Sequence, residues 1–391
     1  MKLTIKTQLL CSTEQLNTLN ETLAACNAAA NVISIFAFEN KTFSRFALQK
    51  ELYHSIREQF PISAQCAVRA FGKVADSYRN KKRRENIHKF RSTGAFPYDA
   101  RILTFFDQNS RVSIWSLKGR LQIPLVLADY QKQFLQYPIG ECDLFIKKGI
   151  AYLLCTVDVP EAQLQVHQDF LGCDLGIVNL LTDSDGTSYS GKIIDDKRNK
   201  IQRLRSALQS KGTKSAKRHL KKLKNKEKNF RRNVNHVISK MIVKKAKDTQ
   251  RCAVLEKLKN VRKLEKKVKR SERSRHSGWA FAQLRNFIEY KARLSGVPFV
   301  LVNPKNTSRE CSRCHYIAKS NRKSQSEFLC GACGHKENAD VNASRVIAHR
   351  ALVDERKVRL QSAMGPVNDP IVSIHPLDVL GASPQPCAGG S

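Results

Sequence analysis

Four cysteines in the C-terminal part of the sequence have the spacing of a metal site. They form two Cys-x-x-Cys pairs separated by fifteen residues: Cys311, Cys314, Cys330 and Cys333. A hairpin between the pairs brings four thiolates to tetrahedral geometry, as in structural Zn²⁺ sites. Such a site has no open coordination position, so we expect it to stabilise the fold and not to catalyse. His315 and His335 lie beside the pairs and are expected outside the ligand set.

Three acidic residues stand out by their surroundings. Asp174 interrupts an apolar stretch interpreted as a strand, Glu256 ends another such stretch, and Asp340 begins a predicted helix. Each residue has an ordinary structural interpretation: a turn residue, a solvated partner of a neighbouring lysine, and a helix N-cap, respectively. Taken singly, none of the three indicates catalysis.

Together, the three acids support a different interpretation. A carboxylate at the end of a buried strand carries a desolvation cost unless a cation or hydrogen bonds compensate it. Three carboxylates that converge on one sheet edge repel each other, and divalent cations relieve this repulsion; oxygen ligands favour Mg²⁺ or Mn²⁺ over zinc. RNase H-like nucleases present acids in this order of strand, strand and helix, and hold two metal ions for phosphodiester hydrolysis. Asp174, Glu256 and Asp340 are therefore the candidate catalytic Mg²⁺ ligands.

The first half of the chain is expected to form a barrel that carries a helical insertion. Residues 1–10 alternate as in a strand, and Ser12 then opens a capping box followed by a long amphipathic helix. A second helix is expected over 45–58, with a third after it. From about 98 to 160 the apolar residues alternate, and two Lys-Gly turns predict hairpins. Strand 1–10 is expected to join these strands.

The second half is expected to supply a sheet with helices, on which the acids lie. Three strands are predicted over 169–190, and two basic helices then lead to a buried strand at 252–255. A helix capped by Ser277 and a strand at 299–302 follow, and the ribbon and the Asp340 helix come last. The sequence thus predicts a multidomain α/β and β protein.

The charge of the chain indicates a polyanionic partner. It holds 69 Lys and Arg against 34 Asp and Glu, a net charge of +35. Residues 197–275 hold 31 basic and five acidic residues, so one fifth of the chain carries an excess of 26 positive charges. A basic run is commonly a solvated helix face, but this density beside a predicted nuclease strand favours a phosphate backbone.

Other features exclude several classes of protein. No apolar run is expected to reach the roughly 18 residues that span a bilayer, and the N-terminus lacks the apolar stretch of a secretory signal. The eight cysteines outside the ribbon are scattered, several in apolar contexts, which is typical of a reducing compartment. We therefore expect a cytoplasmic protein with no membrane partner.

Several motifs resemble one known family. Five segments are similar to the split RuvC nuclease core of the TnpB (OrfB) proteins. They are GCDLGIVNLLTDSDGTSYSG, VLEKLKNVR, SGWAFAQLRNFIEYKA, TSRECSRCH and the later CGACGHKENADVNASRVIA. These proteins are encoded by bacterial insertion sequences and are relatives of type V CRISPR effectors. The N-terminal half, including LAACNAAANVIS, also resembles that family. The combination of DLG, E-x-L and a four-cysteine ribbon before D-x-N-A is more specific than any of its parts.

The resemblance implies an RNA-guided DNA endonuclease with a split RNase H-like (RuvC) core. A guide RNA would pair with one strand of a double-stranded DNA target, and the protein would read a short flanking motif. Asp174, Glu256 and Asp340 would then bind Mg²⁺ or Mn²⁺, and the four cysteines would bind Zn²⁺. Such a protein is expected in the prokaryotic cytoplasm, associated with the nucleoid.

The resemblance also implies a division into domains. We expect a wedge-like barrel (1–10 and 86–168), a helical recognition insertion (11–85), the first two RuvC-like motifs with basic helices (169–310), the zinc ribbon (311–334), the third RuvC-like motif helix (335–352) and a disordered tail (353–391).

Two other functions fit parts of this pattern. An RNA-guided DNA-binding regulator without cleavage would have the same ribbon and charge, and a transposase would use similar two-metal chemistry for strand transfer. All three acids are present, which ranks the nuclease first. The sequence does not fix the guide, the flanking motif or the oligomeric state.

Overall fold

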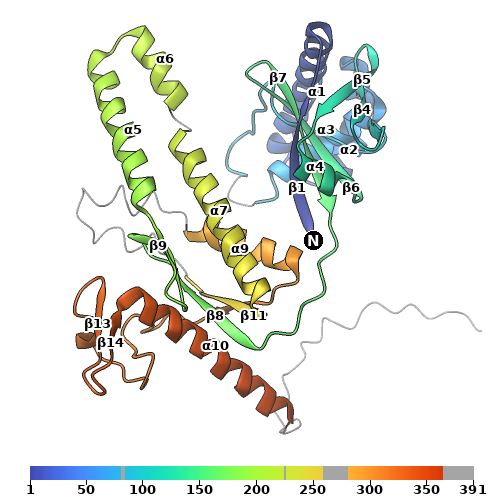
Figure 1. The fold of residues 1–391 in the computed structure, drawn as a ribbon. Helices are drawn as coiled ribbons and strands as arrows, with labels where there is room; N and C mark the ends of the chain where they lie inside the picture. Colours follow the sequence, from blue (N-terminus) through green and yellow to red (C-terminus); the bar gives the residue numbers. More distant parts are fainter. Residues whose placement is uncertain (81–83, 224–225, 259–280, 364–391) are drawn as a thin grey trace, which may run out of the picture. The chain divides into compact units, whose positions relative to one another are not determined.

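The computed structural model describes residues 1–80, 84–223, 226–258 and 281–363 (Figure 1). The chain divides into two compact units, Met1–Pro160 and Glu161–Ser391.

The N-terminal unit is built on a seven-stranded sheet that nearly closes into a barrel, with the strand order β2-β6-β7-β1-β5-β4-β3. The strands are β1 Lys2–Leu9, β2 Phe96–Tyr98, β3 Leu103–Phe106, β4 Arg111–Ser116, β5 Gly119–Val126, β6 Ile139–Lys147 and β7 Ile150–Asp158. Strand β1 pairs with β7 on one side and with β5 on the other. The prediction that the N-terminal strand joins the barrel is therefore confirmed.

The two Lys-Gly turns close hairpins of this sheet, as predicted. Gly119 is the first residue of β5, at the turn from β4, and has a φ of 93°, whereas Lys148 and Gly149 lie between β6 and β7 with φ values of 55° and 72°. Positive φ values of this kind are those that tight hairpin turns require and that glycine adopts at little cost.

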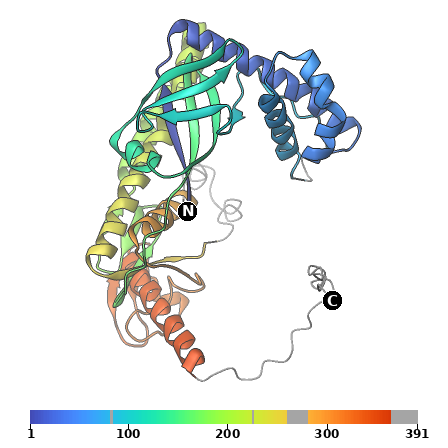
Figure 2. The same cartoon turned by 90° about the vertical axis from the view of Figure 1, so that its right-hand side faces the viewer.

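Three helices between β1 and β2 form the helical part of this unit (Figure 2). They are α1 Thr13–Glu39, α2 Arg45–Gln59 and α3 Ala64–Ser77, and a short helix, α4 Asp129–Leu135, follows β5. The predicted capping box is present: the Gln15 backbone N–H donates to the Ser12 hydroxyl at 3.1 Å, and the Ser12 N–H donates to the Gln15 side chain at 2.9 Å. The segment between β1 and β2 thus contains the predicted helices.

Helix α1 corrects one sequence prediction. By length and composition it is long and apolar enough to cross a membrane, although no such stretch was expected. Leu19, Leu23 and Ile33 on this helix are fully buried within the unit. This is the pattern of a helix in a protein core.

The second unit is built on a five-stranded mixed sheet with the order β10-β9-β8-β11-β12. Its strands are β8 Asp169–Asp174, β9 Asn179–Asp183, β10 Ser188–Ser190, β11 Arg251–Glu256 and β12 Phe299–Val302. Strands β8, β11 and β12 run parallel, whereas β9 and β10 are antiparallel to their neighbours. The chain therefore supplies three antiparallel strands first and adds β11 and β12, both parallel to β8, from later segments.

Helices cover both faces of this sheet. The helices of this unit are α5 Lys192–Lys211, α6 Lys214–Leu223, α7 Lys226–Asp248, α9 Phe281–Ser295 and α10 Ala339–Ala363, of which α7 and α9 pack on one face and α10 on the other. Leu171 of β8 and Leu255 of β11 belong to the core shared with α7 and α9, whereas Phe170 and Val254 belong to the core shared with α10. Because side chains alternate along a strand, the even-numbered residues of β8 and β11 face α10.

The basic segment contains one more helix than predicted. Helices α5, α6 and α7 form a long projection from the sheet (Figure 1), and Gly212, in the left-handed conformation with a φ of 60°, ends α5. Two helices were expected here, because a charged sequence with few apolar residues gives a weak helical period. The strand after them, β11, is present and is buried.

The C-terminal elements differ from the prediction at their ends. A two-stranded sheet of β13 Glu327–Leu329 and β14 Lys336–Asn338 extends the ribbon past residue 334, and a 3-10 turn, η3 Lys319–Asn321, precedes it. Helix α10 begins at Ala339 and continues past the predicted end at residue 352. The proposed Ser277 cap and the tail from 364 onward lie outside the described residues.

Candidate active site and metal centre

Two of the predicted acids end neighbouring parallel strands. Cys173 of β8 pairs with Leu255 of β11, so Asp174 and Glu256, one residue further on, lie at the same edge of the sheet. Both are even-numbered residues and both face α10. The carboxyl ends of parallel strands are where ligand sites form in open α/β sheets. The backbone therefore holds these two carboxyl groups side by side.

A glycine brings α10 onto this edge. A Cβ atom at Gly172 would lie 2.0 Å from the Ser344 carbonyl oxygen and 2.7 Å from the Ala348 backbone nitrogen, both on α10. Only glycine permits this approach. Gly172 precedes Asp174 by two residues on the same strand face, and Ser344 follows Asp340 by one helical turn. The close packing thus brings Asp340 to the level of Asp174.

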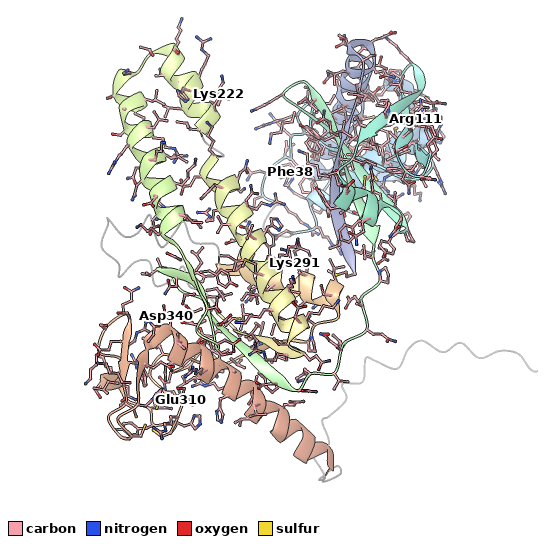
Figure 3. All side chains as sticks on the ribbon, viewed as in Figure 1. Phe38, Arg111, Lys222, Lys291, Glu310 and Asp340 are labelled. Carbon is pink, nitrogen blue, oxygen red and sulfur yellow. The ribbon has the colours of Figure 1, made fainter. Side chains whose placement is uncertain are left out.

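Asp340 is not the helix cap. The Asn338 side-chain oxygen accepts hydrogen bonds from the backbone N–H groups of Asp340, at 3.0 Å, and Val341, at 3.3 Å, which is the role of an N-cap. The Asp340 carboxylate instead accepts a hydrogen bond from the Asn179 side-chain amide at 3.0 Å and lies 3.6 Å from the Arg322 guanidinium. Figure 3 shows Asp340 at the start of α10. Its carboxylate is therefore available for other ligands.

The other two acids act on the carboxyl group of Asp174. Burial and then the charges of Glu256 and Asp340, opposed by Arg322, together raise the pKa of Asp174 to about 7. Burial also raises the pKa of Glu256, which is 8% exposed, although the Thr307 hydroxyl donates a hydrogen bond to it. A cluster of this kind is short of positive charge, and its hard oxygen donors suit Mg²⁺ or Mn²⁺.

Three partners of the acids were missed in the sequence. Asn179 begins β9, Thr307 follows β12, and Arg322 lies between the cysteine pairs. The stretch around Arg322, SNRKSQS at 320–326, is polar and basic, and this composition predicts an exposed fingertip. None belongs to a motif of fixed spacing with the acid that it contacts, because each contact joins distant segments. The sequence offered only a weak signal, the polar Asn179 in the otherwise apolar run at 177–181.

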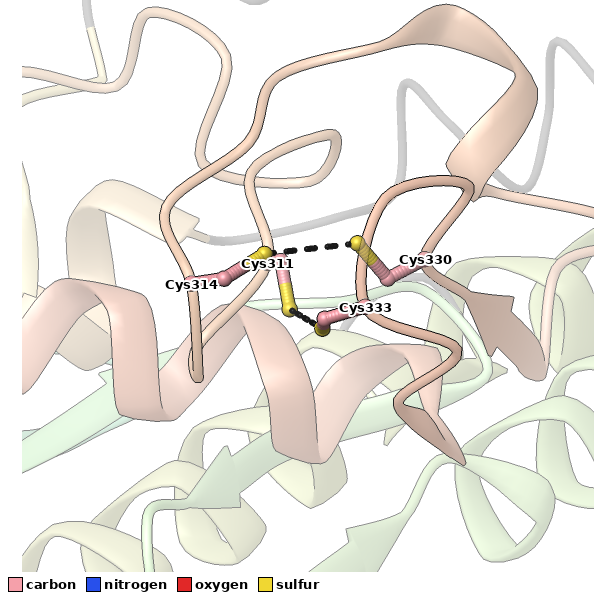
Figure 4. Close-up of side chains that lie close together, drawn as sticks. All are labelled: Cys311, Cys314, Cys330 and Cys333. Atoms are coloured by element: carbon pink, nitrogen blue, oxygen red, sulfur yellow. Dashed lines mark hydrogen bonds between the residues drawn. The ribbon is translucent and has the colours of Figure 1, made fainter.

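The four predicted cysteines lie together (Figure 4). Their sulfur atoms all lie within 4.8 Å of one another, with 3.7 Å between Cys311 and Cys333 and 3.5 Å between Cys314 and Cys330. Zinc–sulfur bonds of about 2.3 Å in a tetrahedron place the sulfur atoms about 3.8 Å apart. The cluster therefore fits a zinc ribbon.

Buried amides fasten the ribbon. Asn321 is fully buried and donates to the carbonyl oxygens of Arg309, at 3.0 Å, and Tyr316, at 3.1 Å. On α10, Asn342 accepts from the Ser312 N–H at 2.9 Å and donates to the Glu310 carbonyl oxygen at 2.8 Å. The stretch expected to be a fingertip is thus partly internal, and Arg322 follows Asn321 directly.

The two histidines beside the cysteine pairs make other contacts. His315 Nδ1 lies 3.1 Å from a Glu310 carboxylate oxygen, and its ring stacks on His349 with centroids 3.9 Å apart. Arg350 Nε donates to the other oxygen of Glu310 at 3.2 Å. His335 Nε2 lies 3.4 Å from a Glu337 oxygen. The contacts of His315 and Glu310 with His349 and Arg350 join the ribbon to α10. Both histidines lie outside the cluster of four cysteines, in agreement with the expectation.

Two family models match the second unit and the strand before it. The OrfB_IS605 model, described as "Probable transposase", matches residues 152–267, and the "Cas12f1-like, TNB domain" model matches residues 281–347. The first match includes Asp174 and Glu256, and the second includes the ribbon and Asp340. The resemblance to TnpB (OrfB) proteins and to type V CRISPR effectors is confirmed.

Named relatives agree with these matches. "TnpB-like protein MJ0751" of Methanocaldococcus jannaschii is 28% identical over 57% of this chain and 84% of its own length. "CRISPR-associated endodeoxyribonuclease Cas12f1" of Syntrophomonas palmitatica is 30% identical over 49% of this chain and 42% of its own length. "Putative RNA-guided DNA endonuclease InsQ" of Escherichia coli is 29% identical over 48% of this chain and 50% of its own length. The chain thus spans about half, or less, of the two relatives that are named as endonucleases.

Proposed function

We propose that this protein is an RNA-guided DNA endonuclease that hydrolyses phosphodiester bonds with divalent metal ions. One observation carries the proposal: Asp174, Glu256 and Asp340 come from three distant segments and meet on one face at one edge of the sheet. The relatives named as DNA endonucleases support the reaction. The mixed sheet, with three leading antiparallel strands and two later parallel strands, supports a split RNase H-like (RuvC) core.

Asp174, Glu256 and Asp340 would hold Mg²⁺ or Mn²⁺. Bound ions of this kind supply an activated water and stabilise the leaving oxygen. The chain's own residues prepare the ligands: the Asn179 amide and the Thr307 hydroxyl each donate to one carboxylate and fix its orientation. Arg322 offsets part of the negative charge and would lie close to a scissile phosphate.

A guide RNA and a double-stranded DNA target are the proposed partners. The name of InsQ supports RNA guidance, and the basic helices α5–α7 supply a surface that suits phosphate backbones. Sequence specificity would come from base pairing, as in other guided nucleases. We propose the same domain roles as the resemblance implies, with the wedge-like barrel at 1–10 and 86–168, and a place of action at the prokaryotic nucleoid.

The four cysteines would hold one zinc ion with a structural role. The sulfur positions support this proposal, since they match a closed tetrahedral site. Asn342 and Arg322 connect the ribbon to the acid cluster. Zinc would thereby position the catalytic carboxylates without touching the substrate.

Cleavage by the purified complex tests the proposal. The protein is purified with RNA transcribed from its own locus and given a plasmid that carries the matching target. We expect cutting that requires both the RNA and Mg²⁺, and that is lost in Asp174→Ala and Glu256→Ala. Asp248→Ala is the matched control, because Asp248 is exposed at the end of α7. Wild-type cutting by either acid variant would contradict the assignment.

The same assay separates the two other functions. Target occupancy without nicking would identify an RNA-guided regulator, and joined DNA products in place of cut ones would identify a transposase. Both outcomes would reject the nuclease proposal.

A further inference from the structure

One short segment joins the sheet to the zinc ribbon and carries a partner of Glu256. This connector, residues 303–310, begins after Val302, the last residue of β12, and ends directly before Cys311. In its middle, Thr307 is only 4% exposed, and its hydroxyl donates a hydrogen bond to the Glu256 carboxylate. The shape of the connector therefore decides where this hydroxyl lies.

A single arginine of α10 binds both ends of the connector. The Arg350 Nη1 atom donates to the Asn303 carbonyl oxygen at 2.7 Å, and its Nε atom donates to the Glu310 carboxylate at 3.2 Å. The Nη2 atom donates to the same Glu310 oxygen. Because the guanidinium group is planar and its N–H groups have fixed directions, these bonds hold the two ends at a fixed separation.

Hydrogen bonds within the connector make it rigid. The Lys305 N–H donates to the Asn303 side-chain oxygen at 3.0 Å. The N–H groups of Arg309 and Glu310 donate to the Asn306 carbonyl oxygen at 2.8 Å and 3.0 Å. Since the segment is short and internally bonded, a displacement of either end also displaces Thr307, which lies between these bonds.

Fastening the ribbon to α10 explains only one part of this arrangement. The ion pair of Arg350 with Glu310 is sufficient for that purpose, and Arg345 of α10 forms a second ion pair with Glu337 of the ribbon strand β14. The bond from Arg350 to Asn303 does not serve it, because Asn303 directly follows a strand of the sheet and lies outside the ribbon. This bond instead brings the first end of the connector to the group that holds its last residue.

The charge of Arg350 offers a second way to act on Glu256. Burial raises the pKa of Glu256, and the Thr307 hydrogen bond and the positive charge of Arg350 oppose this rise. Arg350→Lys keeps the charge but loses the fixed fork of donors, since an ammonium group acts as a point charge. The two modes of action are therefore separable by experiment.

We propose that Arg350 is a positioning residue for Glu256: it holds the connector in the shape that places the Thr307 hydroxyl against the Glu256 carboxylate. The inference rests on the proposed function, in which Glu256 is a ligand of Mg²⁺ or Mn²⁺. Loss of a hydrogen bond to a metal ligand commonly lowers metal affinity by about 10- to 100-fold. Arg350 thus supports metal binding through the connector.

Mn²⁺ binding to the zinc-loaded full chain tests the proposal without cleavage. Free Mn²⁺ is measured by electron paramagnetic resonance, and Asp174→Asn gives the background of binding outside the carboxylate cluster. We expect Thr307→Val to bind about tenfold more weakly than wild type, and Thr307→Ser, which keeps the hydroxyl, to bind nearly as wild type. Arg350→Lys should bind at least about fivefold more weakly. Arg309→Gln is the control, because Arg309 is an exposed residue of the same connector, and it should bind as wild type.

The combination of two changes shows whether Arg350 acts through Thr307. Residues that act through one contact have effects that do not add. The double variant Arg350→Lys and Thr307→Val should therefore bind Mn²⁺ within about twofold of Thr307→Val alone, whereas independent roles would multiply the losses to about fiftyfold. The Mg²⁺ concentration for half-maximal cleavage should follow the same pattern.

Two results would overturn the proposal. Wild-type Mn²⁺ affinity in Arg350→Lys would show that the charge alone is sufficient, and multiplied losses in the double variant would show that Arg350 does not act through Thr307. Zinc content is measured for every variant. If Arg350→Lys loses zinc, Glu310→Gln, which weakens the same ion pair and keeps an acceptor oxygen, takes its place with the same expected coupling.

The outcomes also separate this proposal from the proposed function. A wild-type complex that cuts its target, combined with either overturning result, leaves the nuclease proposal standing. A wild-type protein with neither Asp174-dependent Mn²⁺ binding nor cleavage overturns both.

Discussion

The cysteine cluster and the carboxylate cluster, both in the second unit, are built in opposite ways. Each cysteine pair comes from one tight turn, and the sulfur atoms already lie at distances that suit a metal ion. The carboxylates come from two strand ends and a helix start that are far apart in the chain, and burial and their own repulsion raise the pKa of Asp174. The first cluster suits a closed structural site. In the second cluster, burial and repulsion between carboxylates disfavour the charged form, and a bound cation would compensate both.

Loss of the zinc ligands should have the largest effect, because it removes the support for both clusters. We expect Cys330→Ser to lose zinc and nearly all cleavage, since structural zinc contributes on the order of 10 kcal/mol to small metal-stabilised folds. Zinc content by plasma emission and cleavage rate are the measurements. Cys252→Ser, a buried cysteine outside the ribbon, should keep its zinc. Active protein without zinc would contradict the proposal that the zinc ribbon positions the carboxylate cluster.

Gly172→Ala tests the contact that places Asp340. The new methyl group would overlap the Ser344 carbonyl oxygen, so α10 must shift, and we expect a loss of about 1–3 kcal/mol in the free energy of unfolding with a larger loss of cleavage. Gly140→Ala on β6 is the control, because its Cβ would have only an ordinary contact at 3.6 Å. Thermal unfolding and cleavage rates of both variants check the prediction. An active Gly172→Ala protein would show that the close approach is unnecessary.

The pH dependence of stability tests the electrostatic difference. A carboxyl group whose pKa is raised in the folded state binds more protons there than in the unfolded chain, so metal-free protein should lose stability as the pH rises from about 4 to about 7. The loss is at most about 1.4 kcal/mol per pH unit. It should shrink in Asp174→Asn, where the raised pKa of Glu256 remains, and in saturating Mg²⁺. Denaturant unfolding at several pH values measures it, and a flat profile for metal-free wild type would contradict the repulsion.

Arg322 should show the smallest of these effects. Arg322→Gln removes a positive charge beside Asp340, and we expect cleavage to slow by about tenfold and the acid limb of its pH profile to move upward, because the pKa of Asp174 rises. Lys323→Gln, the exposed neighbour, should behave as wild type. An unchanged pH profile in Arg322→Gln would limit this arginine to a structural role.

The sequence predicted local features better than contacts between distant segments. The cysteine pairs, the Ser12 capping box and the Lys-Gly hairpins each depend on neighbours within a few residues, and all are present in the structure. The three acids were found because strand ends and a helix start are visible as local patterns.

Long-range contacts were not visible in the sequence. Asn338 and Asp340 are both good capping residues, so only the fold shows that Asn338 caps α10 and leaves Asp340 free. Arg322 looked like one charge of an exposed loop. Only the structure shows that the neighbouring Asn321 is buried and that the Arg322 guanidinium lies beside the Asp340 carboxylate. The close approach at Gly172 likewise depends on a helix that starts far along the chain.

The most direct test of the central claim is a Mg²⁺ titration of cleavage by zinc-loaded complexes. Wild type and Asp174→Asn are each prepared with their guide RNA and with one zinc ion per chain confirmed. We predict that cutting by wild type rises with Mg²⁺ to a plateau, whereas Asp174→Asn cuts at no Mg²⁺ concentration while keeping its zinc. Cleavage by Asp174→Asn at the wild-type rate would contradict the claim that the carboxylate cluster performs the chemistry.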